Sequence, residues 1–304
     1  MGTESFYNAI GRNKRNTWLL VLIFAGLVFA VGYFFGLYFG SPWFGLVFGV
    51  IAGSVMLLTT YFAGDKALLF ASRAKQIAKA DAPQLFNVVE EMSIAAGLPM
   101  PKVYIIKDSA PNAFATGRDP KHASVAITTG LMEKLNRDEL QGVMAHEMSH
   151  VGNRDILWAM MIGILVGLIA LMADAFLRTM WWGGRQRRSS SGKRSGGAEV
   201  IIMLLGLVFM ILAPIFAQIL QLAMSRQREY LADASAARLT RNPEGLASAL
   251  EKISADPDVL EVANRATQHL YIVNPIKSFE KRANTIFNTH PPIQDRINRL
   301  RSMR

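Results

Sequence analysis

Residues 139–157, ELQGVMAHEMSHVGNRDIL, decide how the rest of the chain is interpreted. They hold His146 and His150, four positions apart, with Glu147 beside the first histidine. Residues four apart lie on one face of a helix, so the two imidazoles can bind one metal ion, and neutral imidazole is a good ligand for zinc. Glu147 points roughly 100° away, where its carboxylate can take a proton from a water that the metal activates. The pattern therefore predicts a catalytic zinc site on a helix.

A catalytic zinc needs a third protein ligand and leaves its fourth position to water. The chain has no cysteine, which excludes thiolate ligands, disulfides and cysteine nucleophiles. The other candidates are His122, His269, His290 or a carboxylate. The segment SRQREYLADASAA offers Glu229 and Asp233 on one helical face, and we favour Glu229 as the third ligand. Asp233 would then fix a ligand histidine by a hydrogen bond to its free nitrogen. The alternative is a solvated helix face on which both carboxylates pair with Arg226 or Arg228.

Four uncharged stretches indicate a membrane protein: residues 17–39, 40–64, 156–173 and 200–224. Each of the first two is long enough to cross about 30 Å of hydrocarbon as a helix. The first is too long for a signal peptide, and a second span follows it at once. The chain is 51% hydrophobic and 18% charged, whereas soluble proteins carry about a quarter charged residues. We expect an integral membrane protein that contacts the lipid bilayer.

Basic residues flank the first pair of spans on both sides, at positions 12–15 and 66–79. The positive-inside rule therefore places the N-terminal tail and everything after residue 64 in the cytoplasm. The net charge of +10 follows the same rule, and no pattern predicts nucleic-acid binding. The basic loop 178–198 conflicts with the rule if both flanking stretches span the membrane. A hairpin packed in or on the cytoplasmic leaflet is the alternative, and we favour true spans.

We divide the chain into four parts. Residues 1–64 are an N-terminal membrane hairpin with spans at about 17–39 and 42–64, and residues 65–155 are the first part of a catalytic domain. Residues 156–224 are a second apolar hairpin that contains the basic loop 178–198, and residues 225–304 complete the catalytic domain with the third metal ligand. The helices that carry the ligands are expected to continue from the apolar segments, which would place the metal on the order of 10 Å beyond the span ends.

Local signals predict an α+β fold that is mostly α. They predict helices over 83–97, from Asn136, over 243–253 and from Pro292, and strands over 102–106, 112–116 and 123–129. Asn136 followed by Glu139 forms a capping-box pattern, which predicts where the helix of the opening motif begins. The connector from Gly117 to Pro120 is rich in turn residues.

Five segments together resemble the HtpX-type integral-membrane zinc metalloproteases, which are relatives of the prenyl-protein (CaaX) endopeptidases. These segments are NAFATGRDPKHASVAITTGLM, AHEMSH, SRQREYLAD, HLYIVNP and THPPIQDRI. The resemblance covers nearly the whole chain. It implies a zincin-type catalytic domain with a small β-sheet and an HExxH helix, beside the membrane helices. It also implies one zinc per chain, held by His146, His150 and Glu229, with Glu147 as the general base.

The resemblance further implies that Asn112, Ala113 and Phe114 belong to the edge strand of the active site. An unpaired strand can bind an extended peptide through backbone hydrogen bonds, although Phe114 is about as well explained as a core aromatic residue. His290 is expected to stabilise the oxyanion of the reaction, and the alternative is a loop histidine held by two prolines. Arg296 is expected to contact a site carboxylate or a substrate carbonyl. His122 and His269 are interpreted as structural.

The sequence thus predicts a multi-pass zinc endopeptidase of the cell inner membrane, whose catalytic domain faces the cytoplasm. Its substrates would be polypeptides, namely misfolded or surplus membrane proteins removed in stress response and quality control. One alternative is a site-specific processing protease of the CaaX type. Another is a catalytically silent membrane scaffold that binds zinc. Natural substrates and oligomeric state are not predicted.

Overall fold

The computed structural model describes residues 41–161, 226–260, 271–273 and 291–303, with a few isolated residues between positions 15 and 33. Most of the predicted first span lies outside the described residues. So do most of the predicted second hairpin and its basic loop, and so do His269 and His290. The described part is mostly helical with one small sheet, which confirms the predicted α+β class.

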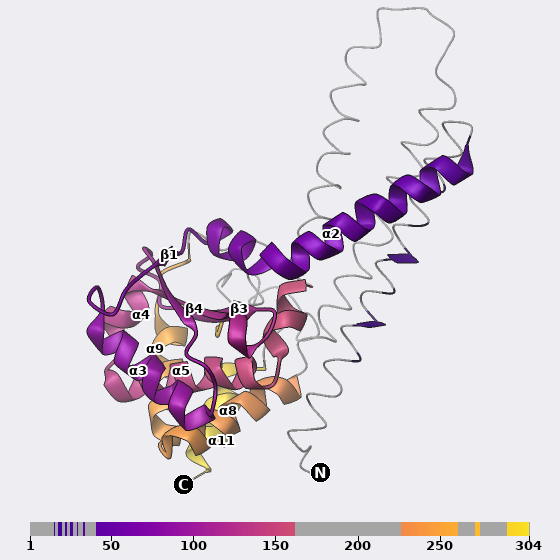
Figure 1. Ribbon diagram of the computed structural model, residues 1–304. Coiled ribbons are helices and arrows are strands. Elements are labelled where there is room, and N and C mark those ends of the chain that lie inside the picture. Colours follow the sequence, from indigo (N-terminus) through magenta and orange to yellow (C-terminus); the bar gives the residue numbers. More distant parts are fainter. Residues whose placement is uncertain are drawn as a thin grey trace, which may run out of the picture.

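Four short strands form a mixed sheet in the order β1-β2-β4-β3 (Figure 1). They are β1 (Lys75–Gln76), β2 (Lys102–Ile106), β3 (Ala113–Gly117) and β4 (Ala123–Thr128). The central pair β2 and β4 is parallel, whereas β1 and β3 pair antiparallel at the two edges. The predicted strands are confirmed within one residue at their ends. The predicted turn contains Gly117 at φ 140° and a short 3-10 helix, η1 (Pro120–His122).

Helix α5 (Arg137–Gly152) carries the opening motif and lies between the sheet and the C-terminal helices (Figure 1). It begins as predicted, because the Asn136 side chain accepts from the Glu139 N–H while the Glu139 carboxylate accepts from the Asn136 N–H. The remaining helices of this domain are α3 (Pro83–Ala96), α4 (Thr129–Lys134), α8 (Arg226–Thr240), α9 (Pro243–Ala255) and α11 (Ile293–Arg301). The left-handed residue Gly97 ends α3, as the sequence predicts.

Side chains of β3 alternate between two apolar clusters. Ala113 and Ala115 belong to the larger core, which α3, α5 and α9 also fill. Phe114 belongs to a smaller cluster on the other side of the sheet, together with Tyr271. Because alanine side chains are short, α5 can pack close to β3, and the two elements are in contact.

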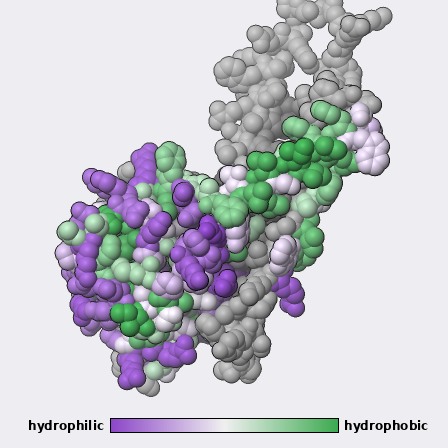
Figure 2. All heavy atoms as spheres, in the orientation of Figure 1, coloured by the Kyte–Doolittle hydropathy of each residue, from purple (hydrophilic) through white to green (hydrophobic). Residues whose placement is uncertain are grey.

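Helix α2 (Pro42–Ala71) is the one helix among the described residues that is long and apolar enough to cross a membrane. It begins where the sequence predicts, because the Ser41 side chain accepts from the Phe44 N–H and Pro42 occupies the first helical position. The helix does not stop at the last uncharged residue but continues through Lys66 to the catalytic domain. Large apolar side chains are exposed along it, and Figure 2 shows them over α2 while hydrophilic side chains predominate on the domain. An exposed apolar surface of this extent is typical of a helix in lipid.

The prediction that the HExxH helix continues directly into the third apolar stretch is wrong. α5 ends at Gly152, the chain turns through Asn153 and Arg154, and a helical segment restarts at Asp155. Arg154 has φ 60°, in the left-handed region that a non-glycine residue adopts only at some cost. The break changes the direction of the chain between the metal-site helix and the apolar stretch.

Two glycines allow α5 and α9 to cross with their backbones nearly in contact. A Cβ atom added to Gly142 would lie 2.7 Å from the backbone nitrogen and 2.9 Å from the Cα atom of Leu246. A Cβ atom added to Gly245 would lie 2.7 Å from the carbonyl oxygen of Asp138. Backbone atoms cannot move aside as a side chain can, so both positions require glycine.

Gly142→Ala is therefore expected to lower the free energy of unfolding by about 1–3 kcal/mol, the usual cost of overpacking. An unobstructed helix would show the opposite sign, because alanine is favoured over glycine in helices by roughly 0.5–1 kcal/mol. Denaturant titration of the purified protein in detergent measures the change. Arg238→Ala, at an exposed position of α8, is the control. A more stable Gly142→Ala variant would contradict the close crossing.

Candidate metal centre

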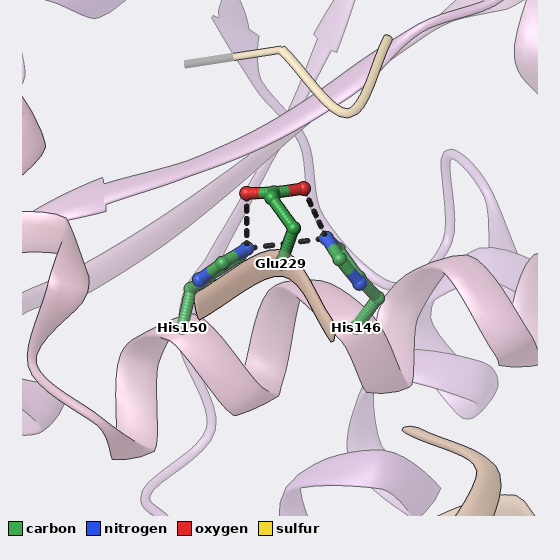
Figure 3. A group of neighbouring side chains, drawn as sticks. All are labelled: His146, His150 and Glu229. Atoms are coloured by element: carbon green, nitrogen blue, oxygen red, sulfur yellow. Dashed lines mark hydrogen bonds and ion pairs between the residues drawn. The ribbon is translucent and has the colours of Figure 1, made fainter. Parts of the chain in front are cut away.

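Three potential metal ligands converge above α5 (Figure 3). The Nε2 atoms of His146 and His150 lie 3.1 Å apart. The carboxylate of Glu229, from α8, lies above both rings: Oε2 is 3.7 Å from the Nε2 of His146, and Oε1 is 3.6 Å from the Nε2 of His150. The helical spacing thus brings together the three residues that the sequence selected.

These distances match the geometry that zinc requires. A tetrahedral zinc ion, with bonds of about 2.0–2.2 Å to nitrogen and oxygen, places its ligand atoms roughly 3.4 Å from one another. The three contacts bracket that value. Two neutral imidazoles whose Nε2 lone pairs face each other repel unless a cation lies between them. The donor set therefore fits a divalent metal ion, and its two nitrogens and one carboxylate are ligands that zinc accepts.

Asp233 holds the outer nitrogen of His146, which is the contact that the sequence analysis expects of it. Its Oδ1 atom lies 3.0 Å from the Nδ1 of His146. Arg296 binds the same carboxylate with two hydrogen bonds, from Nε at 2.8 Å and from Nη2 at 2.7 Å. With Nδ1 facing a carboxylate, Nε2 is the nitrogen that carries the lone pair toward the metal position.

Asp155 holds His150 in the same manner, and sequence reasoning missed it. Its Oδ2 atom lies 3.0 Å from the Nδ1 of His150. The signal was present in the sequence, since Asp155 follows His150 by five residues. An unbroken helix, however, would have turned it to a different side from His150. The turn at residues 153–154 brings it back.

Burial and neighbouring charges raise the pKa values of Glu147 and His150 and lower that of His146. Burial raises the pKa of Glu147 to about 7, and the negative charge of Glu229 adds to this rise. Burial alone would lower the pKa of His150, but the hydrogen bond with Asp155 and the charge of Glu229 outweigh it and raise the pKa to about 9. Burial lowers the pKa of His146 despite its hydrogen bond with Asp233. A bound cation would compete with the proton on His150, because metal ligation requires the neutral imidazole.

Glu147 is not one of the three converging ligands. It follows His146 on α5 and is buried, and the backbone of Ala115 in β3 favours its ionised form. This position agrees with the prediction that its side chain points away from the two histidines along the helix. A carboxylate with a pKa near 7 is suited to accept and return a proton.

The predicted edge-strand residues lie on or next to β3, and the side chains of all three are buried in the protein. Phe114 is fully buried and packs edge-on against Tyr271, with ring centroids 5.2 Å apart, as expected of the core alternative. Asn112 is buried and donates from Nδ2 to the carbonyl of Val273 at 3.0 Å. The Ala113 carbonyl accepts from the Ile272 N–H at 3.0 Å. The segment 271–273 therefore occupies the beginning of the β3 edge.

Arg296 is fully buried and contacts a site carboxylate, which is one of the two roles considered for it. Besides Asp233, it reaches the carbonyl of Ile272 at 3.1 Å and lies 3.3 Å from Oε2 of Glu229. Burial opposes its charge, but Asp233 raises the pKa of its guanidinium, so it stays protonated. His122 lies on the exposed surface beside Asp119, away from the metal group, as its structural interpretation predicts.

Comparison with known proteins places the chain in a family of peptidases. The model of peptidase family M48 matches residues 79–304, which include every described residue of the site. The chain belongs to peptidase family M48. The M48 match confirms the resemblance that the sequence motifs indicated.

Curated relatives share the whole length of this M48 chain. A Protease HtpX homolog of Thermoanaerobacter pseudethanolicus is 46% identical over 303 residues, covering 100% of this chain and 99% of that one. A Protease HtpX homolog of Dictyoglomus thermophilum is 45% identical, with 98% and 95% of the two chains covered. One from Lactobacillus acidophilus is 42% identical, with 98% and 99% covered. The chain is a membrane-associated metalloprotease.

A solved structure has a similar fold. The crystal structure of S. mikatae Ste24p matches with a TM-score of 0.51 and 19% sequence identity, over 97% of this chain and 67% of that one. At this identity the likeness concerns the fold of the M48 domain. The family implies a metal and polypeptide substrates, and the His146, His150 and Glu229 group is where the described residues can hold the metal.

Arg296→Met is expected to lower the free energy of unfolding by about 3–5 kcal/mol, the usual cost of breaking a buried ion pair from one side. The loss follows because Asp233 and Glu229 would remain buried without the guanidinium that compensates their charge. Denaturant titration of the metal-free protein measures it. Arg238→Met removes an exposed arginine and should change the stability by less than about 0.5 kcal/mol. Equal effects of the two variants would contradict the role of Arg296.

Proposed function

We propose that the chain is a zinc-dependent endopeptidase that degrades misfolded or surplus membrane proteins. The observation that carries the proposal is the convergence of His146, His150 and Glu229, with both outer imidazole nitrogens held by carboxylates. We propose that these three residues bind one zinc ion per chain. When bound, zinc would lower the pKa of a coordinated water and polarise the substrate carbonyl.

Glu147 is the proposed general base. It lies next to the three ligands and is buried, and its pKa near 7 allows it to accept a proton from water and return it to the leaving nitrogen. The backbone of Ala115 in β3 lies close enough to favour the ionised form of this carboxylate. His290 remains a sequence-based proposal for stabilising the oxyanion.

The outer edge of β3 is the proposed site for the substrate backbone. Because β4 covers one side of β3, backbone groups of alternate residues face the other side. Ile272 and the Asn112 side chain already bind the backbone of Ala113, so the proposed contact with the substrate begins at Ala115. Recognition through backbone hydrogen bonds depends little on side chains, which suits the digestion of unfolded chains. The buried side chains of Asn112 and Phe114 would support the strand from behind rather than contact the substrate.

The proposed topology is multi-pass, with the catalytic domain on the cytoplasmic side of the inner membrane. The apolar exposed surface of α2, the uncharged stretches and the distribution of basic residues support it. We also propose the division at residues 64, 155 and 224, with the catalytic domain in two parts that flank the second apolar hairpin.

Glu147→Gln tests the mechanism. Glutamine keeps the size and the hydrogen bonding of the side chain but cannot accept a proton, so zinc content should be unchanged while cleavage falls by ~10²–10⁴-fold or more. The measurement compares turnover of an unfolded, unprenylated protein at equal zinc content. His146→Ala, in contrast, should lose most of the zinc as well.

Two results would count against this mechanism. Cleavage by Glu147→Gln within a few-fold of the parent chain would show that another group is the base. Cleavage confined to prenylated CaaX peptides would instead support the site-specific processing alternative.

A cysteine placed at Ser190, in the basic loop, tests the topology. Labelling of intact cells by an impermeant thiol reagent is expected, because two true spans put the loop outside the cytoplasm. The chain has no other cysteine, so the signal has a single source. Labelling only after lysis would show that both stretches stay on the cytoplasmic side.

A further inference from the structure

Asp155 is a buried carboxylate that the proposed reaction does not use. Its Oδ2 atom lies 3.0 Å from the Nδ1 of His150, on the opposite side of the ring from the nitrogen that faces Glu229. The side chain therefore reaches the metal position only through His150. A carboxylate in this place fixes the ring orientation and directs the second nitrogen toward the metal.

The local backbone is what brings Asp155 to the histidine. α5 ends at Gly152, Arg154 takes a left-handed conformation at φ 60°, and the helix restarts at Asp155. Such a conformation costs of order 1–3 kcal/mol at a non-glycine residue and persists only where the surroundings hold it. Here it points one side chain of the new helical segment back toward the end of α5.

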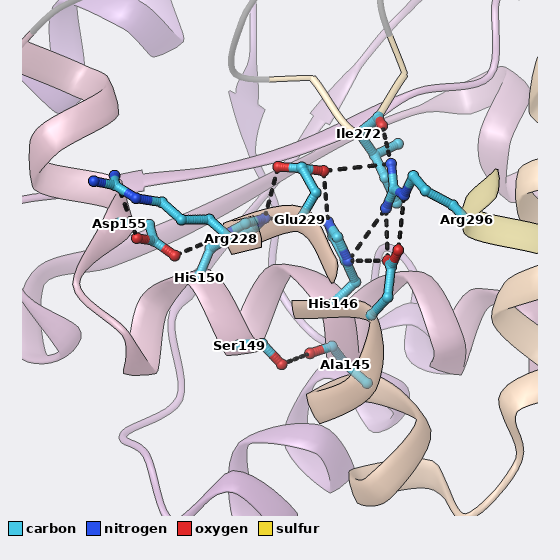
Figure 4. Close-up of polar contacts among 10 residues, drawn as sticks. Ala145, His146, Ser149, His150, Asp155, Arg228, Glu229, Ile272 and Arg296 are labelled. Carbon is cyan, nitrogen blue, oxygen red and sulfur yellow. Dashed lines mark hydrogen bonds and ion pairs between the residues drawn. The ribbon is translucent and has the colours of Figure 1, made fainter. Parts of the chain in front are cut away.

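Arg228 lies on the far side of the Asp155 carboxylate (Figure 4). Its Nη1 atom is 3.7 Å from Oδ1 of Asp155, and its guanidinium carbon lies 5.8 Å from the centre of the Trp158 ring. All three side chains are buried. The guanidinium thus places a positive charge beside the carboxylate, and the ring of Trp158 packs against that guanidinium.

Each of the two candidate ligand histidines thus has a carboxylate at its Nδ1 atom and an arginine beside that carboxylate. Asp233, which Arg296 binds, holds His146. Asp155, beside which Arg228 lies, holds His150 (Figure 4). The first arginine binds its carboxylate at 2.7 Å, whereas the second lies at 3.7 Å, so the second arginine should have the weaker influence.

We propose that Asp155, supported by Arg228, is a positioning residue that orients His150 for metal binding. The inference rests on the proposed zinc site. Asp155 directly precedes the third apolar stretch, and Arg228 follows the fourth by four residues. The pair therefore joins the two places where the chain leaves and re-enters the catalytic domain, and it joins them at a metal ligand.

The test measures zinc affinity rather than activity. The full-length protein is purified in detergent and freed of metal, and zinc binding is followed by competition with a chromophoric chelator. Asp155→Asn should bind zinc ~10–100-fold more weakly, because the neutral amide oxygen accepts the hydrogen bond from Nδ1 more weakly than a carboxylate does. Asp155→Glu, which restores the carboxylate, should recover part of the affinity.

The control is Asp138→Asn, which removes an exposed carboxylate from the first turn of α5 and should leave zinc affinity unchanged. The visible spectrum of the cobalt(II)-loaded protein reports ligand geometry and should change in Asp155→Asn but not in Asp138→Asn. If Asp155→Asn does not fold, Arg228→Lys takes its place and should weaken zinc binding by a smaller factor.

A double variant separates the two residues. If Arg228 acts through Asp155, then adding Arg228→Gln to Asp155→Asn should weaken zinc binding by less than a further twofold. If the two residues act independently, their effects on zinc affinity would multiply, and this result would overturn the role of Arg228. Unchanged zinc affinity and cobalt spectrum in Asp155→Asn would overturn the role of Asp155. The proposed function would still stand in that case, provided that the unmodified protein binds zinc and cleaves protein. A parent chain that binds no zinc would overturn both.

Discussion

The bidentate contact between Arg296 and Asp233 is the interaction on which the site depends. Arg296 comes from α11, Asp233 comes from α8, and Asp233 in turn holds His146 of α5. The same guanidinium reaches the carbonyl of Ile272, whose N–H binds the edge strand. One buried cation thus connects three helices and the sheet. Charge explains the arrangement, since two buried carboxylates near the metal position require a compensating cation.

Much of the fold could be predicted because its signals are local. The capping box at Asn136, the terminating Gly97 and the turn residues from Gly117 to Pro120 act over only a few residues. The three candidate metal ligands could also be predicted, because helical spacing alone places His146 and His150 on one face and the absence of cysteine leaves few other ligands. For these three residues, the ligand preference of zinc and the spacing along a helix indicate the same side chains.

Other features could not be predicted because they depend on contacts between distant segments. The left-handed Arg154 carries no glycine signal, so the sequence favours an unbroken helix and hides the contact of Asp155 with His150. The pairing of Ile272 with Ala113 joins segments far apart in the chain, and no periodicity reveals it. For Phe114, burial preference and motif resemblance pointed to different roles, and only packing against Tyr271 placed its side chain in the core.

The separation of the site residues along the chain has a consequence for biosynthesis. Arg296 lies 150 positions after His146, and the uncharged stretches 156–173 and 200–224 lie between them. A ribosome makes the two histidines and Glu147 long before it makes Glu229, Asp233 and Arg296. Helix α5 is therefore made before the third candidate ligand, Glu229, and before Arg296, the cation that pairs with the buried carboxylates of α8. A chain therefore has the complete group of candidate ligands and compensating charges only after α11 has been translated, so this group cannot act on the same chain before its synthesis is nearly finished.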